Sequence, residues 1–372
     1  MRTGTTAAVK TFLGIVFASL LMVGGTISGR PAQAASAAPV QSCVSGQGSL
    51  SGAGNLALVT VKNNQQSIYL TTASGTARVC LATLASTAQA QLPSWSPDGQ
   101  YIAFVLAYSK DGGLSQTFTL YAVNMDGSNP HAVSSPSPGL NYSWSPDSQH
   151  IVYSQQGVLT VTDLNGKGAP LLNPPEAGDF SPAWSPDGKS IAYTRNDGLY
   201  VVNADGTNPH NVSNPNHSLP DSADQFPVWS PDSQQIAFRS TRDGASAEQV
   251  YVVSVKGGQS VRVSDLKMRN STDRTIAWSA DSQQVAFTTR AAANGSVSYV
   301  MIVSANGSNP HRLTKNGSNE SHPAWSKDGK WLAIQVAQSQ TQQNVYVVDV
   351  AATTEHNLTT DSLSDVTPFW QP

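Results

Sequence analysis

The stretch from Pro182 to Ser213, PAWSPDGKSIAYTRNDGLYVVNADGTNPHNVS, decides the fold of this chain. It has a first short strand signal ending at Trp184, apolar runs at 191–193 and 199–202, and a weaker strand signal at 211–213. The links between them, Ser-Pro-Asp-Gly and Asn-Ala-Asp-Gly, have the composition of tight turns. The stretch therefore predicts one antiparallel sheet of four short strands.

Related units recur along the chain, and tryptophan marks each of them. Seven of the eight Trp follow one another at intervals of 40 to 49 residues, at positions Trp95, Trp144, Trp184, Trp229, Trp278, Trp325 and Trp370. The Asp of the first turn is kept in all six complete units, while Ser148, Ser233 and Ser282 replace its Gly, so we expect some strain there. Four-stranded units of roughly 40–50 residues predict a β-propeller.

The two ends of the chain determine the number of blades. Six complete units begin at Trp95 and run through the one that begins at Trp325. Residues 56–84 contain three strand signals but no Trp strand, and residues 366–370 contain a Trp strand alone. We therefore predict an all-β, seven-bladed propeller in which the C-terminal strand joins the N-terminal blade and removes open sheet edges. Six blades, an open array or two sandwiches are the alternatives.

The composition agrees with an all-β fold. Only 12% of the residues are charged, and there are 20 Asp against 4 Glu, with 29 Gly and 22 Pro. Asp, Gly and Pro favour turns over helix interiors. The formal net charge of −3 indicates no basic surface for nucleic acid.

The N-terminus has the layout of a secretory signal peptide. Arg2 and Lys10 precede an apolar run from Phe12 to Val23, and Ala32-Gln33-Ala34 resembles a cleavage site. We expect residues 1–34 to be a signal peptide, 35–53 a linker and 54–372 the propeller; a retained membrane anchor is the alternative. The mature chain would have 18 basic and 24 acidic residues, a net charge of −6.

Both cysteines, Cys43 and Cys80, lie beyond the expected cleavage site. An even pair in an exported protein predicts a disulfide, which would tie the N-terminal tail to the first β unit. Two unpaired thiols are the alternative.

The repeated pattern PAWSPDG, IAY and LYVVNADGTNPH resembles the WD-like repeats of the TolB propeller family. The resemblance covers residues 54–372 and implies the propeller fold. TolB resembles a six-bladed propeller preceded by an α/β domain, through which it engages the Tol machinery of the cell envelope. This chain has one predicted blade more, and about 20 residues, 35–54, in place of that domain. Similar propellers also occur in some prolyl-oligopeptidase-type peptidases.

Sequence motifs for catalysis are scarce. The patterns G-x-S-x-G and H-E-x-x-H are absent. His131, His210 and His311 occupy one repeated position and are expected to be structural. His217 and His322 lie in connections that enter Trp strands, where a lyase-type propeller would place metal ligands or a catalytic base; ordinary polar loop residues are the alternative. A single His–carboxylate cluster at the channel mouth would favour an enzyme.

Candidate binding residues lie in irregular connections on one face. These are the connections that lead into the Trp strands and those between second and third strands, and we call their side of the ring the loop-rich face. Variable loops on a rigid frame commonly carry binding sites. The candidates are Asp179, Asp221, Asp224, Arg242, Arg269, Asp273, Arg274, Glu320, Asp361 and Asp365. The alternative is that each Asp caps its own turn.

These patterns favour an exported, non-enzymatic scaffold that binds a protein or polysaccharide partner through its loop-rich face. The alternative is a propeller enzyme, a polysaccharide lyase or glycoside-acting hydrolase, with a site at the channel mouth. We expect no cofactor, no bound metal, no nucleic-acid partner, no membrane span after signal cleavage, and a monomer.

Overall fold

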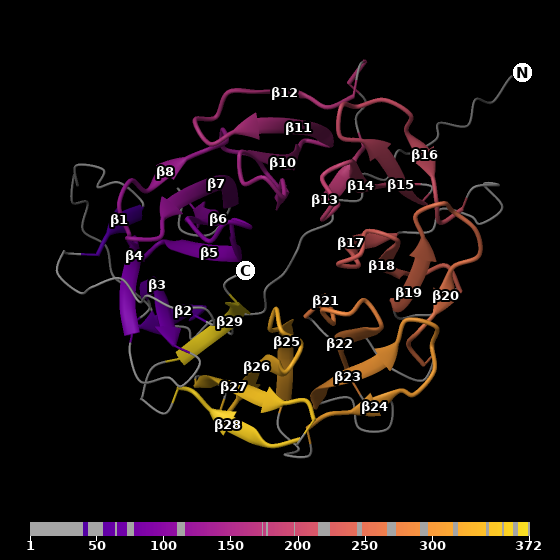
Figure 1. Cartoon of the computed structure of the whole chain (residues 1–372). Helices are drawn as coiled ribbons and strands as arrows, with labels where there is room; N and C mark the ends of the chain where they lie inside the picture. The colour runs from indigo at the N-terminus through magenta and orange to yellow at the C-terminus, as the bar shows by residue number, and fades with distance from the viewer. Residues whose placement is uncertain are drawn as a thin grey trace, which may run out of the picture.

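The structure is a ring of seven β-sheets around a central channel (Figure 1). It is a computed structural model that describes residues 40–43, 55–63, 65–72, 78–109, 116–172, 174–175, 178–196, 198–214, 224–243, 248–265, 273–290, 297–314, 319–339, 342–351, 353–359 and 364–370. Every regular element in these ranges is a strand, and none of them contains a helix that could cross a membrane. The expected signal peptide, residues 1–34, lies outside the described residues.

Blades 1 to 3 are four-stranded antiparallel sheets in which the Trp strand forms one edge. Blade 1 contains β5 (Ala88–Trp95), β6 (Tyr101–Ser109), β7 (Gln116–Asn124) and β8 (His131–Ala132). Blade 2 contains β9 (Leu140–Trp144), β10 (His150–Gln155), β11 (Val158–Asp163) and β12 (Gly168–Pro170). Blade 3 contains β13 (Phe180–Trp184), β14 (Ser190–Arg195), β15 (Gly198–Asn203) and β16 (His210–Asn211).

Blades 4 to 6 repeat the same arrangement. Blade 4 contains β17 (Gln225–Trp229), β18 (Gln235–Ser240), β19 (Gln249–Ser254) and β20 (Val261–Arg262). Blade 5 contains β21 (Ile276–Trp278), β22 (Gln284–Arg290), β23 (Ser298–Ser304) and β24 (His311–Arg312). Blade 6 contains β25 (Asn319–Trp325), β26 (Trp331–Ala337), β27 (Gln343–Asp349) and β28 (Glu355–Asn357).

Blade 7 closes the ring with both ends of the described chain. Its strand order is β1 (Val40–Ser42), β4 (Arg78–Leu84), β3 (Gln65–Thr72), β2 (Asn55–Lys62) and β29 (Ser364–Trp370), and Figure 1 shows β29 beside β2. The prediction of seven blades closed by the C-terminal strand is confirmed. The three residues of β1 fall within the expected linker and add a fifth, outermost strand. Cys43, which follows β1, forms a disulfide with Cys80 in β4, with Cα atoms 5.8 Å apart.

The hydrophobic cores lie between neighbouring blades. One core combines Leu199 and Val201 of blade 3 with Ile236 and Phe238 of blade 4. Another joins the N-terminal strands of blade 7 to Trp95 and other residues of blade 1. Because a four-stranded blade cannot bury its apolar faces alone, each blade depends on the next one around the ring.

The repeat Trp connects neighbouring blades through its indole N–H. The Trp strands are innermost, as predicted, and lie next to one another around the channel. In four blades the indole Nε1 donates a hydrogen bond of 2.8–3.2 Å to the carbonyl of the residue before Trp in the preceding blade. The bonds run from Trp95 to Phe369, Trp229 to Ala183, Trp278 to Val228 and Trp370 to Ala324.

The serines that replace Gly in the first turn also connect blades. Ser148, Ser233 and Ser282 have positive φ angles of 61°, 60° and 61°, where glycine is favoured. Each hydroxyl accepts a hydrogen bond from the backbone N–H of the turn Asp in the preceding blade, at 3.0–3.1 Å. The serine hydroxyl, which glycine would not provide, thus forms a hydrogen bond between two blades.

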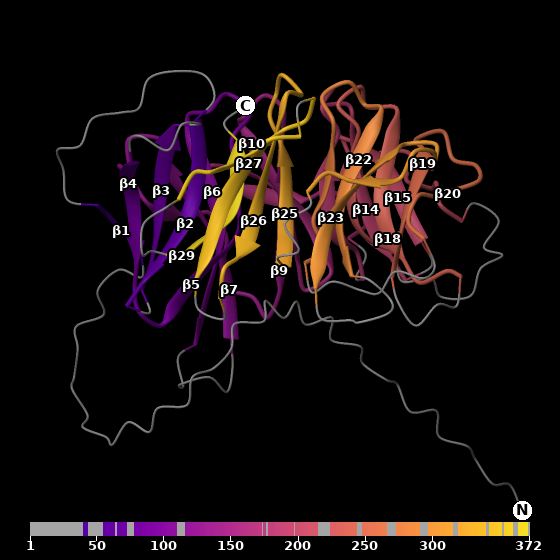
Figure 2. The same cartoon turned by 90° about the horizontal axis from the view of Figure 1, so that it is seen from below.

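Most Trp strands contain a β-bulge at the end from which they start. In five of them the residue three positions before Trp has φ between 49° and 54°, and the pairing register shifts beside it. These residues are Leu92, Ser181, Phe226, His322 and Thr367. Because a bulge redirects the side chains around it, it shapes the loop-rich end of the channel. Edge-on, the blades form one layer with strands running between the two faces (Figure 2).

The indole hydrogen bond can be tested by comparing Trp229→Phe with Trp144→Phe. The two side chains are 7% and 8% exposed, but Trp144 Nε1 has no partner among the described residues. Both variants lose similar volume, whereas only Trp229→Phe loses an interblade bond. We expect Trp229→Phe to lower the free energy of unfolding in urea by about 1 kcal/mol more than Trp144→Phe. Equal losses would contradict the role of this bond.

Candidate functional site

Five of the candidate carboxylates occupy one repeated position, five residues before the Trp of their blade. They are almost completely buried, with residue exposures of 0% to 8%. The five are Asp179, Asp224, Asp273, Glu320 and Asp365. Asp221, Arg269 and Asp361 lie outside the described residues. This spacing can be read from the sequence when each acid is counted from the Trp of its blade. It is missed when the acids are sorted only by the connection in which they lie.

In blades 3 and 4 both oxygens of the buried carboxylate contact an arginine. Arg195 Nε lies 2.7 Å from Asp179 Oδ1, and Arg195 Nη2 lies 3.0 Å from Oδ2. Arg242 Nη2 lies 2.9 and 2.8 Å from the two carboxylate oxygens of Asp224. Arg242 also donates to the carbonyl of Ser213 in blade 3 at 3.2 Å. The pair in blade 4 therefore connects two blades.

Glu320 and Asp365 are held in the same manner by arginines of other strands. Arg312 Nη2 lies 2.9 Å from Glu320 Oε1, and the backbone N–H of Val300 donates to Oε2 at 2.9 Å. Arg78 Nη2 lies 2.5 Å from Asp365 Oδ2, and Thr60 donates to Oδ1 at 2.6 Å. A buried carboxylate with this many donors is satisfied by the protein itself.

The arginines of three pairs also lie over aromatic rings. Arg195 lies 4.9 Å from the ring centre of Tyr200, and Arg242 lies 4.8 Å from the ring centres of both Phe238 and Tyr251. Arg312 lies 5.0 Å above Tyr299. Such stacking covers the apolar stem of arginine and adds cation–π attraction. Each pair therefore fixes the place where the chain enters a blade.

Asp273 is the exception. Among the described residues, its carboxylate accepts hydrogen bonds from threonines and a backbone N–H rather than from an arginine. Thr275 donates to Oδ1 through its backbone N–H and hydroxyl, while Thr288 and the backbone N–H of His322 donate to Oδ2. Burial alone would raise the pKa of Asp273, but the nearby His322 and these hydrogen bonds lower it to about 2. The His322 ring Nε2 lies 3.7 Å from Oδ1, and its Nδ1 has no partner among the described residues.

Two further cationic side chains lie near Asp273. Arg239 is buried and donates to the carbonyls of Arg274 and Thr288 at 3.1 and 3.2 Å. Arg274 lies 3.2 Å from Glu248 and 5.2 Å from the ring centre of Phe226. The Arg274 side chain remains 36% exposed, so it can meet a partner while the neighbouring acid and ring hold it in place.

Around the mouth, the exposed and partly exposed side chains of the described residues include apolar, aromatic and cationic groups. We call the following set, whose members lie three or four residues before the repeat Trp, the mouth residues: Leu92, Phe180, Phe226, Arg274 and His322. Leu92 is 48% and Phe180 46% exposed, and they are the two most exposed large apolar side chains among the described residues. Five of the ten predicted binding residues are thus buried carboxylates, whereas the side chain of Arg274 is partly exposed.

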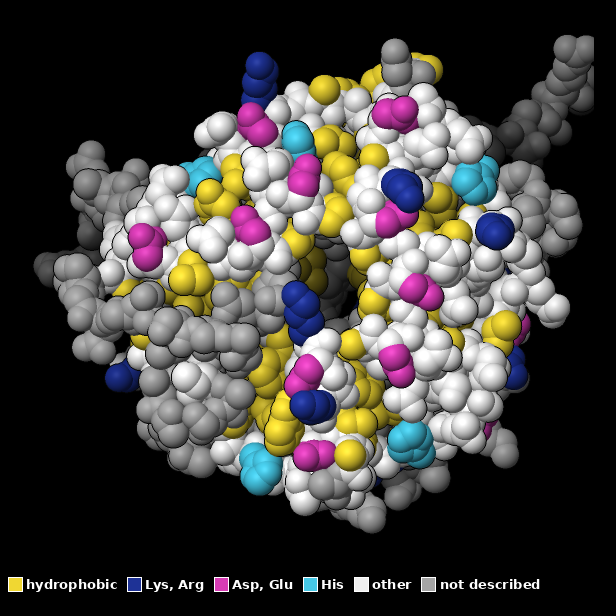
Figure 3. All heavy atoms as spheres, viewed as in Figure 1, with side chains coloured by type: hydrophobic (Ala, Val, Ile, Leu, Met, Phe, Trp, Pro, Cys, Tyr) yellow, Lys and Arg dark blue, Asp and Glu magenta, His cyan; other side chains and the backbone are white. Residues whose placement is uncertain are grey.

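The carboxylates of the Ser-Pro-Asp turns, at the other end of the Trp strands, are exposed. Hydrogen bonds from Ser145 and Ser279 contribute to lowering the pKa of Asp147 and Asp281, respectively. Figure 3 shows acidic side chains spaced around one face of the ring, with hydrophobic side chains close to the central opening.

Within the described ranges, no group of three or more His, Cys, Asp and Glu could hold a metal ion.

The fold and these repeated contacts define a β-propeller of WD-like units. The sequence profile of the TolB beta propeller domain matches residues 102–322, and the chain belongs to that family. A search of curated protein sequences found no match.

Solved structures of several propeller proteins share the fold. TolB from Acinetobacter baumannii is 19% identical, with a TM-score of 0.50 over 85% of this chain and 82% of that one. An oligogalacturonate lyase from Vibrio parahaemolyticus is 13% identical, with a TM-score of 0.55 over 77% and 83%. A prolyl endopeptidase is 12% identical, with a TM-score of 0.57 over 85% of this chain and 50% of that one. These similarities extend to the fold and not to one activity.

Removing one partner of the Asp224–Arg242 pair tests its structural role. Arg242→Met leaves a buried carboxylate without its cation, and we expect a loss of about 3–5 kcal/mol in unfolding free energy. Arg262→Met is the control in the same blade, because the Arg262–Asp243 pair is about one-third exposed and should contribute less than about 1 kcal/mol. The double variant Arg242→Met/Asp224→Asn should lose less than the sum of its single variants. Additive losses would contradict a direct interaction.

The lowered pKa of Asp273 predicts a pH dependence of stability. Its carboxylate stabilises the folded protein above the ordinary pKa of 3.8, and that contribution is lost as the pH falls through about 2. The difference in unfolding free energy between the natural protein and Asp273→Asn should therefore narrow by about 1 kcal/mol between pH 6 and pH 3. Urea unfolding at both pH values measures it. A difference that stays constant or widens would contradict the lowered pKa.

Proposed function

We propose that this chain is an exported, non-enzymatic propeller that binds a protein partner through the mouth of its loop-rich face. The observation that carries the proposal is the exposure of Leu92 and Phe180 on inner strands of two blades, together with the partly exposed Arg274 of a third blade, which lies against Phe226. Aromatic, apolar and arginine side chains of this kind supply most of the binding energy in protein interfaces.

The rigidity of the mouth supports the same proposal. The buried carboxylates five residues before Trp hold the chain at the start of five inner strands. A surface that is already ordered loses less conformational entropy on binding. The mouth residues are therefore presented on a fixed frame rather than on a chain that must fold around its partner.

The disulfide supports export. Cys43 and Cys80 are bonded in the structure, and structural disulfides persist mainly in oxidising compartments outside the cytosol. Together with the signal-like N-terminus, the disulfide favours a place in the periplasm, at the cell surface or in the medium.

Charge substitutions at the mouth test the proposed interface. Leu92→Glu and Phe180→Glu should each reduce capture of the partner from the native envelope fraction at least tenfold, a loss of about 1.4 kcal/mol. Val261→Glu is the matched control, since Val261 is 41% exposed but lies in the outer strand β20. Capture is measured by quantitative mass spectrometry with the immobilised protein.

Equal capture by all variants would overturn the proposed interface. Protease treatment of the envelope fraction separates the two classes of partner, because a protein partner is lost and a polysaccharide partner is retained. Retained capture after protease treatment would replace the protein by a polysaccharide.

One observation favours the alternative of an enzyme. His322 is the only histidine at its repeated position, and its ring lies beside the Asp273 carboxylate, an arrangement that general acid–base catalysis uses. Because the fold resembles that of an oligogalacturonate lyase, oligogalacturonate is a suitable trial substrate. The proposed binding function predicts no unsaturated product on incubation. Product formation that is lost in His322→Gln would establish the enzyme instead.

A further inference from the structure

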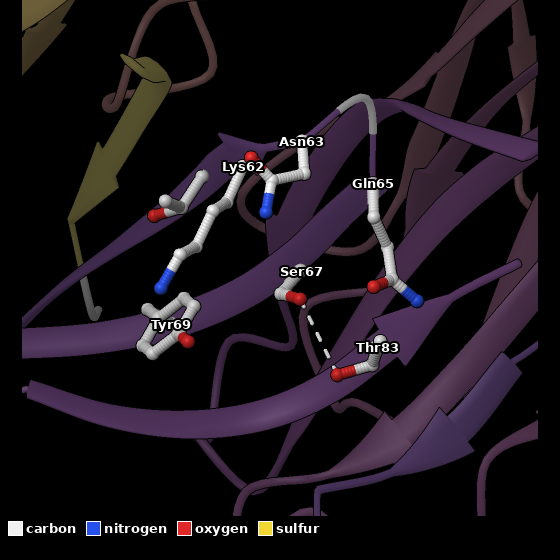
Figure 4. A pocket seen from close by; sticks show the side chains of 7 residues that line it. Lys62, Asn63, Gln65, Ser67, Tyr69 and Thr83 are labelled. Carbon is white, nitrogen blue, oxygen red and sulfur yellow. Dashed lines mark hydrogen bonds between the residues drawn. The ribbon is translucent and has the colours of Figure 1, made fainter. Parts of the chain in front are cut away.

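A small polar pocket lies beside the β2–β3 hairpin of blade 7, on the loop-rich face, and none of its lining residues is a mouth residue (Figure 4). Its volume is about 250 Å³. Its lining comes from three adjacent strands and the hairpin between two of them: Thr60, Lys62, Asn63, Gln65, Ser67, Tyr69 and Thr83. Alternate residues of a strand point to the same side of a sheet. Residues 60 and 62 in β2 and 65, 67 and 69 in β3 therefore line one continuous surface.

The pocket contains polar groups that have no partner among the described residues. Lys62 is exposed and forms no ion pair with a described residue, and the lining includes no carboxylate. Within the described ranges, the Asn63 amide and the Tyr69 hydroxyl also have no hydrogen-bond partner. In Figure 4 the Lys62 ammonium group, the Asn63 amide and the Tyr69 ring lie around the same space.

Other lining residues make the walls rigid. Gln65 Nε2 donates to the Leu84 carbonyl at 3.0 Å, and Ser67 donates to Thr83 Oγ1 at 3.3 Å. Thr83 Oγ1 also lies 3.5 Å from Cys43 Sγ of the disulfide. A pocket fixed by hydrogen bonds and a disulfide needs little reorganisation when a ligand enters.

The chemistry of this lining specifies the class of ligand. A lysine with no carboxylate among the described lining residues attracts an anion. Hydroxyl and amide groups suit a ligand with several hydroxyls, and the Tyr69 ring provides an apolar surface. The volume lies just below the range of ordinary small-molecule pockets, which begins at about 300 Å³. We propose that this pocket binds a single anionic sugar residue, a site separate from the proposed protein interface at the mouth.

Saturation-transfer difference NMR on the whole protein can test this site with glucuronate and glucose as probes. Glucuronate should bind at least tenfold more tightly than glucose, because only glucuronate carries a charge for Lys62. Lys62→Gln should remove this preference, whereas Lys189→Gln, a change at an 81% exposed lysine in a Ser-Pro-Asp-Gly turn, should preserve it. Tyr69→Phe should weaken binding of both sugars, since it removes a hydroxyl and keeps the ring.

The remaining comparisons separate the sources of the anion. Glucose 1-phosphate binding with the same Lys62 dependence would support the site and add sugar phosphates to its ligands. Inorganic phosphate has no C–H protons, so its binding is measured by its displacement of glucuronate. Displacement that shows phosphate binding as tightly as glucuronate would overturn the proposal, because the sugar would then contribute nothing. No transfer to glucuronate, or equal responses in Lys62→Gln and Lys189→Gln, would also overturn it. Leu92→Glu should leave glucuronate binding unchanged, so this site and the mouth interface can fail separately.

Discussion

One repeated contact links neighbouring blades at four places in the ring: the indole N–H of the repeat tryptophan donates to the inner strand of the preceding blade. It joins strands that are far apart in the chain, and Trp95 and Trp370 form it on the two sides of the closing strand β29. The apolar cores lie in the same interfaces, between blades rather than within them. A blade is therefore stable only as a member of the closed ring.

Burial of charge determines what the loop-rich face can offer a partner. The carboxylates before the Trp strands are held by arginines, threonines and backbone N–H groups, so their charge is used inside the protein. Among the described mouth residues, Leu92 and Phe180 are exposed, and Phe226, Arg274 and His322 are partly exposed. Because these side chains stand on strands held between neighbouring blades, the mouth is a rigid surface suited to a complementary partner.

The sequence predicted the repeat well, because Trp spacing, turn residues and apolar periodicity are local signals. It did not predict the ion pairs, because their arginines come from unrelated places: Arg78 from a fourth strand, Arg195 from a second strand and Arg312 from the preceding blade. The carboxylates themselves share the spacing of five residues before Trp, a repeat that indicates a structural role. The exposure of the mouth residues was not predicted either. Leu92 and Phe226 have positive φ angles at β-bulges, and leucine and phenylalanine do not by themselves indicate such angles.

Hydrogen–deuterium exchange with and without the captured partner tests the central claim most directly, that binding occurs at the mouth of the loop-rich face. The account predicts new protection of backbone amides at the starts of β5, β13, β17 and β25, and unchanged exchange in the Ser-Pro-Asp turns at the other end of the Trp strands. Protection confined to those turns, with the strand starts unaffected, would contradict it.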